Sequence, residues 1–538
     1  MLNVILLLWA VAVLAMSCRG IEDLVNMLAS LRWLKQGGQR FSPDSQEYPF
    51  IILLLPVLRE QRVIQETLRV LAGLKYPHER LRICVVTTEK ELAQRTQAQS
   101  RLLSLAGDIS SKRISLSLLI EKYLGLFSED TLTNVISVAQ HKGNEEEVRQ
   151  YLFDVFQSYP TTIDLVKESI EQLNQQVDMP LFIHLHYPYT EGDVNQQLDY
   201  ALQQMPACLD VDDFTPSTTY LAIYNADSRP HKDTLQLVSE MSHRYGDQHG
   251  MYPPAFQQSA LFLENVGHLG TRGAGLVLQA AALLQSRWVL SHEIPRLRRQ
   301  SRSAFQFNSE KLSNFQRLTG AEFALCVGHG FFLRYDFALR LELFTASNIC
   351  DDFLWSYRLC IEHVPIVPLP LLESAESPIT IKSLIIQKKS WFLGYTEYLR
   401  SRWVILQTKR YDRLTVELVT FYGLLHAFTW LWLSPAIFLA FIVPLAARSW
   451  PMFLITCAVY SLYGLLTYGI LFVELKTLRN KSGGEWKPYA LSPLRRMTLL
   501  FFSLSAFLLE SVGLWWCIYQ RIGWAITRKA AYREKTER

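Results

Sequence analysis

The sequence has no C-x-x-C pair among its eight cysteines, and none of them clusters with histidine at the spacing of a zinc site. It also lacks a charge imbalance, because 54 basic residues stand against 50 acidic residues, for a net charge of +4. The scattered cysteines indicate no disulfide framework and favour a reducing, cytosolic setting for the large domain. The balanced charge gives no reason to expect a nucleic-acid partner.

No basic residue precedes the first apolar segment, Leu2–Ser17, as one would in a secretory signal peptide. This segment is long enough to cross a bilayer with little tilt. We therefore expect residues 1–18 to form an N-terminal transmembrane anchor, followed by an amphipathic interfacial linker over residues 19–47. The alternative is a cleaved signal or a lipoprotein signal that ends at Cys18.

Residues 35 to 415 have the composition of a soluble domain, whereas three apolar segments near the C-terminus are long enough to span a bilayer. These segments are Val419–Ala447, Met452–Val473 and Thr498–Tyr519. These three segments form a cluster over residues 419–520. Basic residues precede the first segment and lie in the linker after the second. The positive-inside rule therefore places these residues, and with them the large domain, in the cytoplasm. We therefore predict a multi-pass protein of the plasma (inner) membrane with a cytoplasmic catalytic domain.

The basic tail, residues 521–538, also favours the cytoplasm, although three C-terminal crossings would place it outside. Either the last apolar segment is a hairpin or an interfacial helix, or the first one, which contains two prolines, is a re-entrant pair. Our hypothesis is a cytosolic tail.

The large domain has the strand–helix alternation of a doubly wound α/β fold. Phe50–Leu55 is a continuous apolar run, typical of a strand buried on both faces of a parallel sheet. Further predicted strands are Arg82–Thr87, Leu181–His186, Tyr220–Tyr224, Phe323–Val327 and Val364–Leu369, and predicted helices are Glu60–Leu74, Asp193–Gln204 and Asp351–Glu362. We interpret polar, helical residues 94–178 as an insertion between two halves of the domain, 48–93 and 179–391, and residues 392–418 as an interfacial segment.

Ligands of doubly wound sheets bind beyond the carboxyl ends of the strands. Asp227 directly follows the predicted strand Tyr220–Tyr224, so it lies where a site is expected. His184 and His186 share one face of another predicted strand, but without a third ligand we favour a structural role over a metal site.

Several different short motifs follow one another between Tyr48 and Trp391. They are Leu55-Pro56-Val57-Leu58-Arg59-Glu60, Glu66-Thr67-Leu68 through Tyr76-Pro77, Gly192 through Leu202, Asn225-Ala226-Asp227-Ser228, Gly328 and Gly330 with Arg334, Asp351-Asp352 with Arg358-Leu359, and Gln387 with Trp391. In order and composition this set resembles the family 2 glycosyltransferases, and the flanking apolar segments resemble its membrane-bound branch, which includes cellulose and hyaluronan synthases.

The resemblance implies a GT-A fold, with a Rossmann-like doubly wound sheet, and a metal-dependent inverting glycosyltransferase. It implies that a sugar passes from a nucleotide sugar, expected to be UDP-linked, to a growing cell-surface or exported glycan. The implied site residues are Asp352 and Asp351 for catalysis; Pro56, Glu60, Glu89 and Asp227 for the donor; Gly328, His329, Gly330, Gln387 and Trp391 for the acceptor; and Asp227 with Asn225 for Mg²⁺ or Mn²⁺.

The sequence departs from the family pattern at several of these positions. Thr87 and Thr88 stand where the family places an Asp-Asp pair that holds the nucleotide. Asn225 replaces the first acid of the D-A-D motif, which weakens the metal site because an amide adds no charge. Lys389 and Ser390 interrupt the Q-x-x-R-W signature of chain-extending members, which weakens the case for processive synthesis.

Two other functions stay open from the sequence. One is sugar transfer to a polyprenyl phosphate at the bilayer, which the amphipathic linker and basic loops would suit. The other is a catalytically degenerate scaffold subunit of a polysaccharide synthesis machine, for which the substituted acids argue. The expected partners are a nucleotide sugar, a glycan or polyprenyl-lipid acceptor, membrane lipid and other subunits of an envelope polysaccharide machine.

Overall fold

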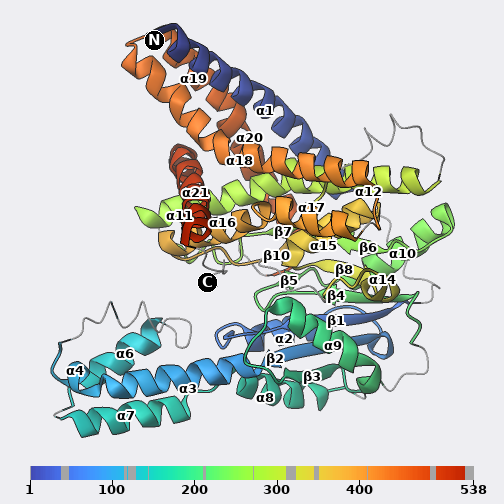
Figure 1. The fold of residues 1–538 in the computed structure, drawn as a ribbon, viewed down its shortest axis with the longest axis vertical. Coiled ribbons are helices and arrows are strands. Elements are labelled where there is room, and N and C mark those ends of the chain that lie inside the picture. The colour runs from blue at the N-terminus through green and yellow to red at the C-terminus, as the bar shows by residue number, and fades with distance from the viewer. Residues whose placement is uncertain are drawn as a thin grey trace.

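The computed structural model describes residues 2–37, 48–113, 118, 129–142, 144–177, 179–209, 214–270, 272–309, 323–344, 351–408, 410–484 and 492–527. Residues 38–47 of the predicted linker and 528–538 of the predicted tail lie outside the description. The molecule is elongated, with the first strands of the β-sheet and a helical arm that projects sideways from them at one end, and long apolar helices at the other end (Figure 1).

A seven-stranded mixed sheet forms the centre of the large domain, in the order β3-β2-β1-β4-β8-β6-β9. Its strands are β1 (Phe50–Pro56), β2 (Leu81–Thr88), β3 (Phe182–Tyr187), β4 (Thr219–Ile223), β6 (Ala255–Gln257), β8 (Phe331–Arg334) and β9 (Ile366–Pro368). The first four strands are parallel to one another, and their order, 3-2-1-4, is that of a Rossmann half. The α/β class expected from the sequence is confirmed.

One strand runs against the others, because β8 pairs antiparallel with both β4 and β6. The sequence prediction of a strand over Phe323–Val327 is wrong, since this segment precedes a turn at residues 328–330 and the strand follows that turn. Side chains satisfy the backbone there instead of a strand ladder. The amide of Cys326 donates to Ser356 Oγ over 2.7 Å, and that of Val327 donates to Gln257 Oε1 over 3.1 Å.

Alternate residues of β1 face two separate hydrophobic cores. Ile51, Leu53 and Leu55 pack with α2, α8 and α10, whereas Ile52 and Leu54 pack with α9, α14 and α15. These helices are α2 (Ile64–Ala72), α8 (Thr162–Asn174), α9 (Val194–Cys208), α10 (Thr234–His249), α14 (Tyr335–Leu341) and α15 (Asp351–Ile361). Full burial on both faces, at about 1.5–3 kcal/mol per large aliphatic side chain, explains the unbroken apolar run.

A helical arm follows β2 and has a small core of its own. It comprises α3 (Glu89–Ser104), α4 (Ala106–Ser110), α6 (Glu129–Gln140) and α7 (Glu145–Ser158). Figure 1 shows the arm extending away from the sheet, as an insertion would. Helix α8, which the sequence placed in the insertion, instead covers the sheet, because Val166 and Ile170 join the core beneath β1.

A three-stranded sheet and a further group of helices lie between the main sheet and the apolar helices (Figure 1). The short strands, in the order β5-β10-β7, are β5 (Arg229–Pro230), β7 (Ala260–Leu261) and β10 (Glu373–Ser374). The helices are α11 (Ala274–Trp288), η2 (Val289–Glu293), α12 (Ile294–Ser309), α16 (Ile381–Tyr395) and α17 (Tyr398–Gln407), and a single turn, η1 (His78–Arg80), precedes β2. Among these, η2 is a π-helical turn between α11 and α12.

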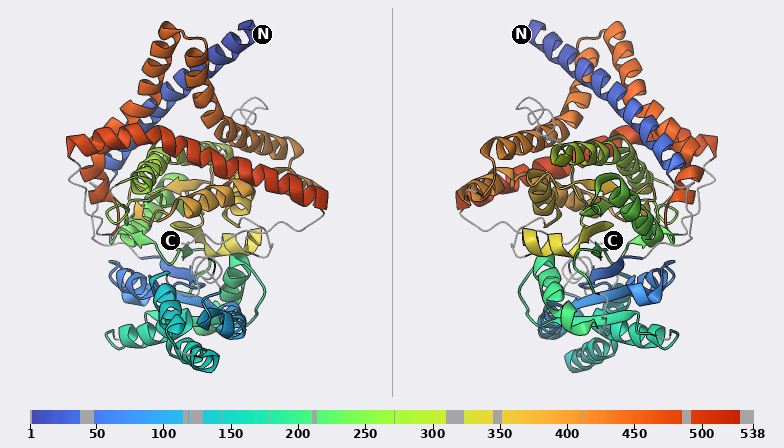
Figure 2. Two further views of the ribbon diagram at one scale, coloured as in Figure 1. Left: turned by 90° about the vertical axis from the view of Figure 1, so that its left-hand side faces the viewer. Right: turned by 90° about the vertical axis from the view of Figure 1, so that its right-hand side faces the viewer.

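Within the residues that the structure describes, four helical stretches are long and apolar enough to cross a membrane. They are formed by α1 (Leu2–Gln36), α18 (Arg413–Ala446), the continuous α19 (Trp450–Tyr460), η3 (Ser461–Leu465) and α20 (Leu466–Lys481), and α21 (Pro493–Thr527). The predicted anchor and the start of the predicted linker form one unbroken helix, α1, which packs against α18, α19 and α20. Helix α21 instead packs on α16 and α11 and runs across the molecule, crosswise to α1 (Figure 2).

Candidate active site

The turn after β4 lies at the switch point of the sheet, where strand order reverses between β1 and β4. Within this turn, the backbone N–H of Asn225 donates to Ser228 Oγ and the backbone N–H of Ser228 donates to the backbone carbonyl of Asn225, both over 3.1 Å. Thr67 of α2 donates to the carbonyl of Ala226. Asp227 is buried at the apex of the turn, so a fixed backbone presents its carboxylate at the carboxyl edge of the sheet.

Asp352 occupies the first turn of α15, where its Oδ1 accepts the amide of Phe353 over 2.9 Å. Gly328 lies against it, because a Cβ added at that glycine would approach the Asp352 Cβ to 3.4 Å. Ser356 links the same two segments, since it donates to the Asp352 carbonyl and accepts the Cys326 amide. The side chain of Asp351 lies outside the described part of the chain.

The loop between these segments needs a glycine at position 330, where φ is +61°. A Cβ there would lie 2.6 Å from the Gln258 carbonyl and 2.9 Å from Glu373 Oε2. His329, which the resemblance assigns to acceptor binding, points inward, and its Nδ1 lies 2.5 Å from Glu373 Oε1. Burial acts to lower the pKa of His329, but Glu373, Glu293 and Asp352 together outweigh it and raise that pKa above its ordinary value.

Apart from Asp227, the donor residues suggested by the sequence lie at or just after the carboxyl ends of β1 and β2. Pro56 ends β1 and Glu89 begins α3, where its Oε2 lies 3.1 Å from His186 Nε2. Thr87, one of the two threonines in place of acids, lies between two histidines, 2.8 Å from His184 Nε2 and 2.9 Å from His186 Nδ1. Burial lowers the pKa of His184 to about 4, so this ring is neutral at pH 7.

Sequence reasoning missed Glu91, which organises the loop after β1. This buried carboxylate accepts the amides of Arg59 and Thr162, over 2.9 and 2.8 Å, and the side-chain amide of Gln61 over 3.0 Å. The loop explains why the helix predicted from Glu60 begins only at Ile64. The amide of Glu60 itself donates to Thr162 Oγ1 over 2.9 Å.

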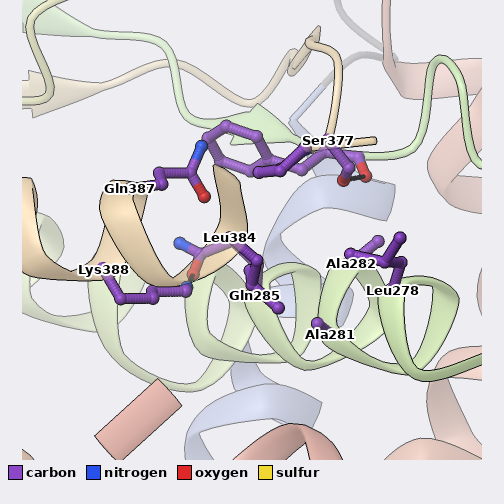
Figure 3. Close-up of a pocket in the computed structure, with 10 residues that line it drawn as sticks. Leu278, Ala281, Ala282, Gln285, Ser377, Leu384, Gln387 and Lys388 are labelled. Atoms are coloured by element: carbon purple, nitrogen blue, oxygen red, sulfur yellow. Dashed lines mark hydrogen bonds between the residues drawn. The ribbon is translucent and has the colours of Figure 1, made fainter. Parts of the chain in front are cut away.

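The acceptor residues suggested by the sequence, Gln387 and Trp391, lie on α16. Trp391 packs against Phe262 with ring centroids 5.7 Å apart. Gln387 is 3% exposed, and its Nε2 has no hydrogen-bond partner among the residues that the structure describes. It lies at a slot between α16 and α11 with apolar walls that include Leu278 and Leu384 (Figure 3).

The two lysines in the Q-x-x-R-W region bind α21. Lys388 Nζ lies 2.7 Å from Glu510 Oε1 and donates to Gln285 Oε1 over 2.6 Å, while Lys389 Nζ lies 4.7 Å from the ring centroid of Trp516. Gly513 allows this close approach, since a Cβ there would lie 2.6 Å from a carbonyl of α16. The interrupted signature therefore serves as a contact between α16 and α21.

Known proteins match the part of the chain that contains Asp352. Residues 295–471 match the model of glycosyl transferase family group 2. The resemblance to the family 2 glycosyltransferases is confirmed over this segment, about a third of the chain, which includes the loop at Gly328, Asp352, Gln387 and Trp391. The Asp227 turn lies outside the matched residues.

Other comparisons add little. A mannosyltransferase from Pyrobaculum calidifontis, in complex with GDP-Man and Mn²⁺, is similar over 95% of this chain and 99% of that chain, at 12% identity and a TM-score of 0.41. A likeness this weak carries no argument about donor or metal. No curated protein matches the sequence.

The oxygen ligands of the Asp227 turn would suit a hard divalent cation, but they are few. Within the described part of the chain, no group of three or more His, Cys, Asp or Glu side chains is placed to hold a metal. A carboxylate and an amide oxygen, from Asp227 and Asn225, are ligand types that Mg²⁺ and Mn²⁺ accept together with phosphate oxygens. The turn therefore fits a cation that arrives with a diphosphate, and does not resemble a closed metal cage.

Proposed function

We propose that the chain is an inverting membrane glycosyltransferase that moves a sugar from a UDP-linked donor to a cell-surface or exported glycan. One observation carries the proposal. The Asp227 turn and Asp352 lie at the two ends of one contact chain, because Gly328 lies against Asp352, His329 contacts Glu373, and Glu373 accepts Ser228 Oγ over 3.1 Å. Sugar transfer needs a group that binds the donor phosphates and a base that accepts a proton from the acceptor, and it needs the two close together.

In this proposal, the donor diphosphate lies at the carboxyl ends of β1 and β4. Asp227 and Asn225 would hold Mg²⁺ or Mn²⁺, which when bound neutralises the leaving diphosphate. The loop held by Glu91 and the residues at the end of β2 border the nucleotide. With threonines in place of acids there, base recognition relies on neutral groups such as Thr87 and His184.

Asp352 is the proposed general base. It accepts the proton of the acceptor hydroxyl as that oxygen bonds to the anomeric carbon, while the bond to the diphosphate breaks on the opposite face and its electron pair leaves with the phosphate. A single displacement inverts the anomeric centre. The ring of Trp391 offers an apolar face to an acceptor sugar, and the Gln387 amide offers hydrogen bonds beside it.

Turnover by the detergent-purified full chain tests the proposal, with a panel of UDP and GDP sugars and with or without Mn²⁺. Asp352→Asn should lower kcat about 10²- to 10⁴-fold, because the amide cannot accept the proton. Asp227→Asn should raise the Mn²⁺ concentration needed for half-maximal rate. Full activity of Asp352→Asn would show that the base is assigned to the wrong residue.

The acceptor has two candidates that the product separates. The packing of α16 on the apolar helix α21 favours a polyprenyl phosphate as the alternative to a glycan. Radiolabel that extracts into organic solvent identifies a lipid acceptor, whereas label in the aqueous or polymeric fraction identifies a glycan. A folded protein that binds no nucleotide would instead identify a scaffold subunit.

A further inference from the structure

We propose that His329 and Glu373 form a buried positioning pair that fixes the Asp227 turn relative to the loop facing Asp352. The inference rests on the proposed function and deepens it, because it gives two residues a role in aligning the donor and the base. It also replaces the acceptor-binding role that the resemblance gave to His329.

The pair is shielded from water. Glu373 is fully buried and His329 is 6% exposed, with 2.5 Å between Nδ1 and Oε1. Glu293, from the π-helical turn η2, acts on the imidazole electrostatically together with Glu373. A polar pair at this depth interacts far more strongly than a surface pair, and either partner alone would be a buried polar group without its partner.

Glu373 connects the pair to the donor side. Its Oε1 accepts Ser228 Oγ over 3.1 Å, and that same hydroxyl accepts the Asn225 amide over 3.1 Å. Ser228 follows Asp227 directly, so movement of Glu373 would change the backbone that presents the Asp227 carboxylate. The Glu373 amide donates to the Ser259 carbonyl over 3.0 Å, which holds β10 in place.

His329 connects the pair to the base side. The neighbouring Gly328 lies against Asp352, and the carbonyl of His329 accepts a hydrogen bond from Gln257 Nε2 over 2.9 Å. Gln257 is fully buried and also accepts the Val327 amide, so the loop has one fixed backbone path. The edge of the imidazole also faces Phe262, whose ring packs on Trp391. In this proposal, the Asp227 turn, Asp352 and Trp391 are therefore joined by a chain of contacts that passes through the buried pair of His329 and Glu373.

An acceptor sugar could not bind the Nδ1 atom of His329 without displacing Glu373, and only 6% of the residue is exposed. The pair should therefore affect the rate of transfer much more than the affinity for either substrate. Misplacement of reacting groups by about 1 Å is enough to cost on the order of 10²-fold in rate.

The test uses the detergent-purified full chain with Mn²⁺ and compares His329→Gln, Glu373→Gln and the double variant with wild type. We expect each single variant to lower kcat about 10- to 100-fold, with the donor dissociation constant from direct titration unchanged within about threefold. The double variant should lose no more than the worse single variant, because the two residues act as one unit. His243→Gln, a half-buried histidine that contacts Tyr252, is the matched control and should keep the wild-type kcat.

Ser228→Ala is a milder variant in case the buried substitutions lower the yield of folded protein. It removes only the hydroxyl that joins the turn to Glu373, and it should lower kcat without weakening donor binding. Wild-type kcat in His329→Gln and Ser228→Ala, or losses that multiply in the double variant, would overturn the inference. A wild-type chain that neither binds nor turns over any nucleotide sugar would instead contradict the proposed function.

Discussion

At the scale of single residues, three buried acids organise the site although no motif contains them. Glu91 holds the loop after β1, Glu373 binds His329 and the Asp227 turn, and Glu293 lies on η2 near both. Buried carboxylates are rare unless they are paired, because removing a charge from water is costly. Each therefore marks a place where the backbone must be held for a reason beyond packing.

Glu293 gives a pH-dependent prediction. Burial, as the main cause, raises the pKa of its carboxyl to about 7 in the folded chain, with His329, Glu373 and Arg296 as its charged neighbours. Between the unfolded value of about 4.3 and pH 7, the folded chain keeps a proton that the unfolded chain has lost, so this contribution to stability is lost as pH rises. Glu293→Gln should therefore gain stability relative to wild type between pH 5 and pH 8, by about 1–3 kcal/mol.

Thermal unfolding in detergent at the two pH values measures this difference. An equal effect of Glu293→Gln at pH 5 and pH 8 would contradict the raised pKa.

The sequence was enough to predict features that depend on local pattern. The apolar run Phe50–Leu55 predicts a buried strand, and the position of Asp227 directly after the predicted strand Tyr220–Tyr224 places this acid at the sheet edge. It could not predict Glu373, because nothing in its neighbourhood shows that a histidine 44 positions earlier returns to meet it. The strand after Gly330 was misplaced for a similar reason, since side chains from Gln257 and Ser356 decide which segment joins the ladder.

At the scale of elements, α16 joins the site to the apolar helices. One of its faces presents Gln387 and Trp391, and another holds α21 through Lys388 and Lys389. The pair between Lys388 and Glu510 is buried on the lysine side, where only 1% of the residue is exposed. Lys388 therefore connects the orientation of α16 to that of α21, which covers it.

Lys388→Met should lower the thermal stability markedly, by about 3–5 kcal/mol, because it leaves Glu510 without its cation in an apolar setting. Combining it with Glu510→Met should restore most of the loss, since two apolar side chains replace the pair. Lys35→Met is the matched control and should cost at most about 1 kcal/mol, because its pair with Glu474 is largely exposed. A double variant no more stable than Lys388→Met would contradict this account of the pair.

At the scale of the whole molecule, the path of α21 leads us to predict that this helix lies at the membrane interface, one of the alternatives that the charges left open. Helix α21 lies crosswise to α1 and packs along α16 and α11 (Figure 2). Its outer face carries large exposed apolar side chains, among them Phe501 and Tyr519, at 80% and 77% exposure. A helix with these properties suits the plane of the membrane interface better than a crossing.

With α21 at the interface, the chain crosses the membrane through α1, α18 and the α19–α20 stretch only. We therefore predict that the C-terminus lies on the same side as the sheet. Protease accessibility of a C-terminal epitope in sealed, oriented vesicles checks this, with an engineered cysteine on the exposed arm as the reference for the side of the large domain. Protection of the epitope under conditions that expose the arm would require a fourth crossing.

Trp391 and α21 belong to neighbouring layers, so the acceptor end of the proposed site lies about one helix diameter, roughly 10 Å, from the lipid boundary. An acceptor that reaches the site from the bilayer therefore meets the protein by diffusion in two dimensions and not in three. For an acceptor carried in the bilayer, saturation of the enzyme depends on the number of acceptor molecules per unit area of membrane. Adding inert lipid while the bulk concentrations of protein and acceptor stay constant would therefore slow the reaction. For an acceptor in water the same dilution would have no effect.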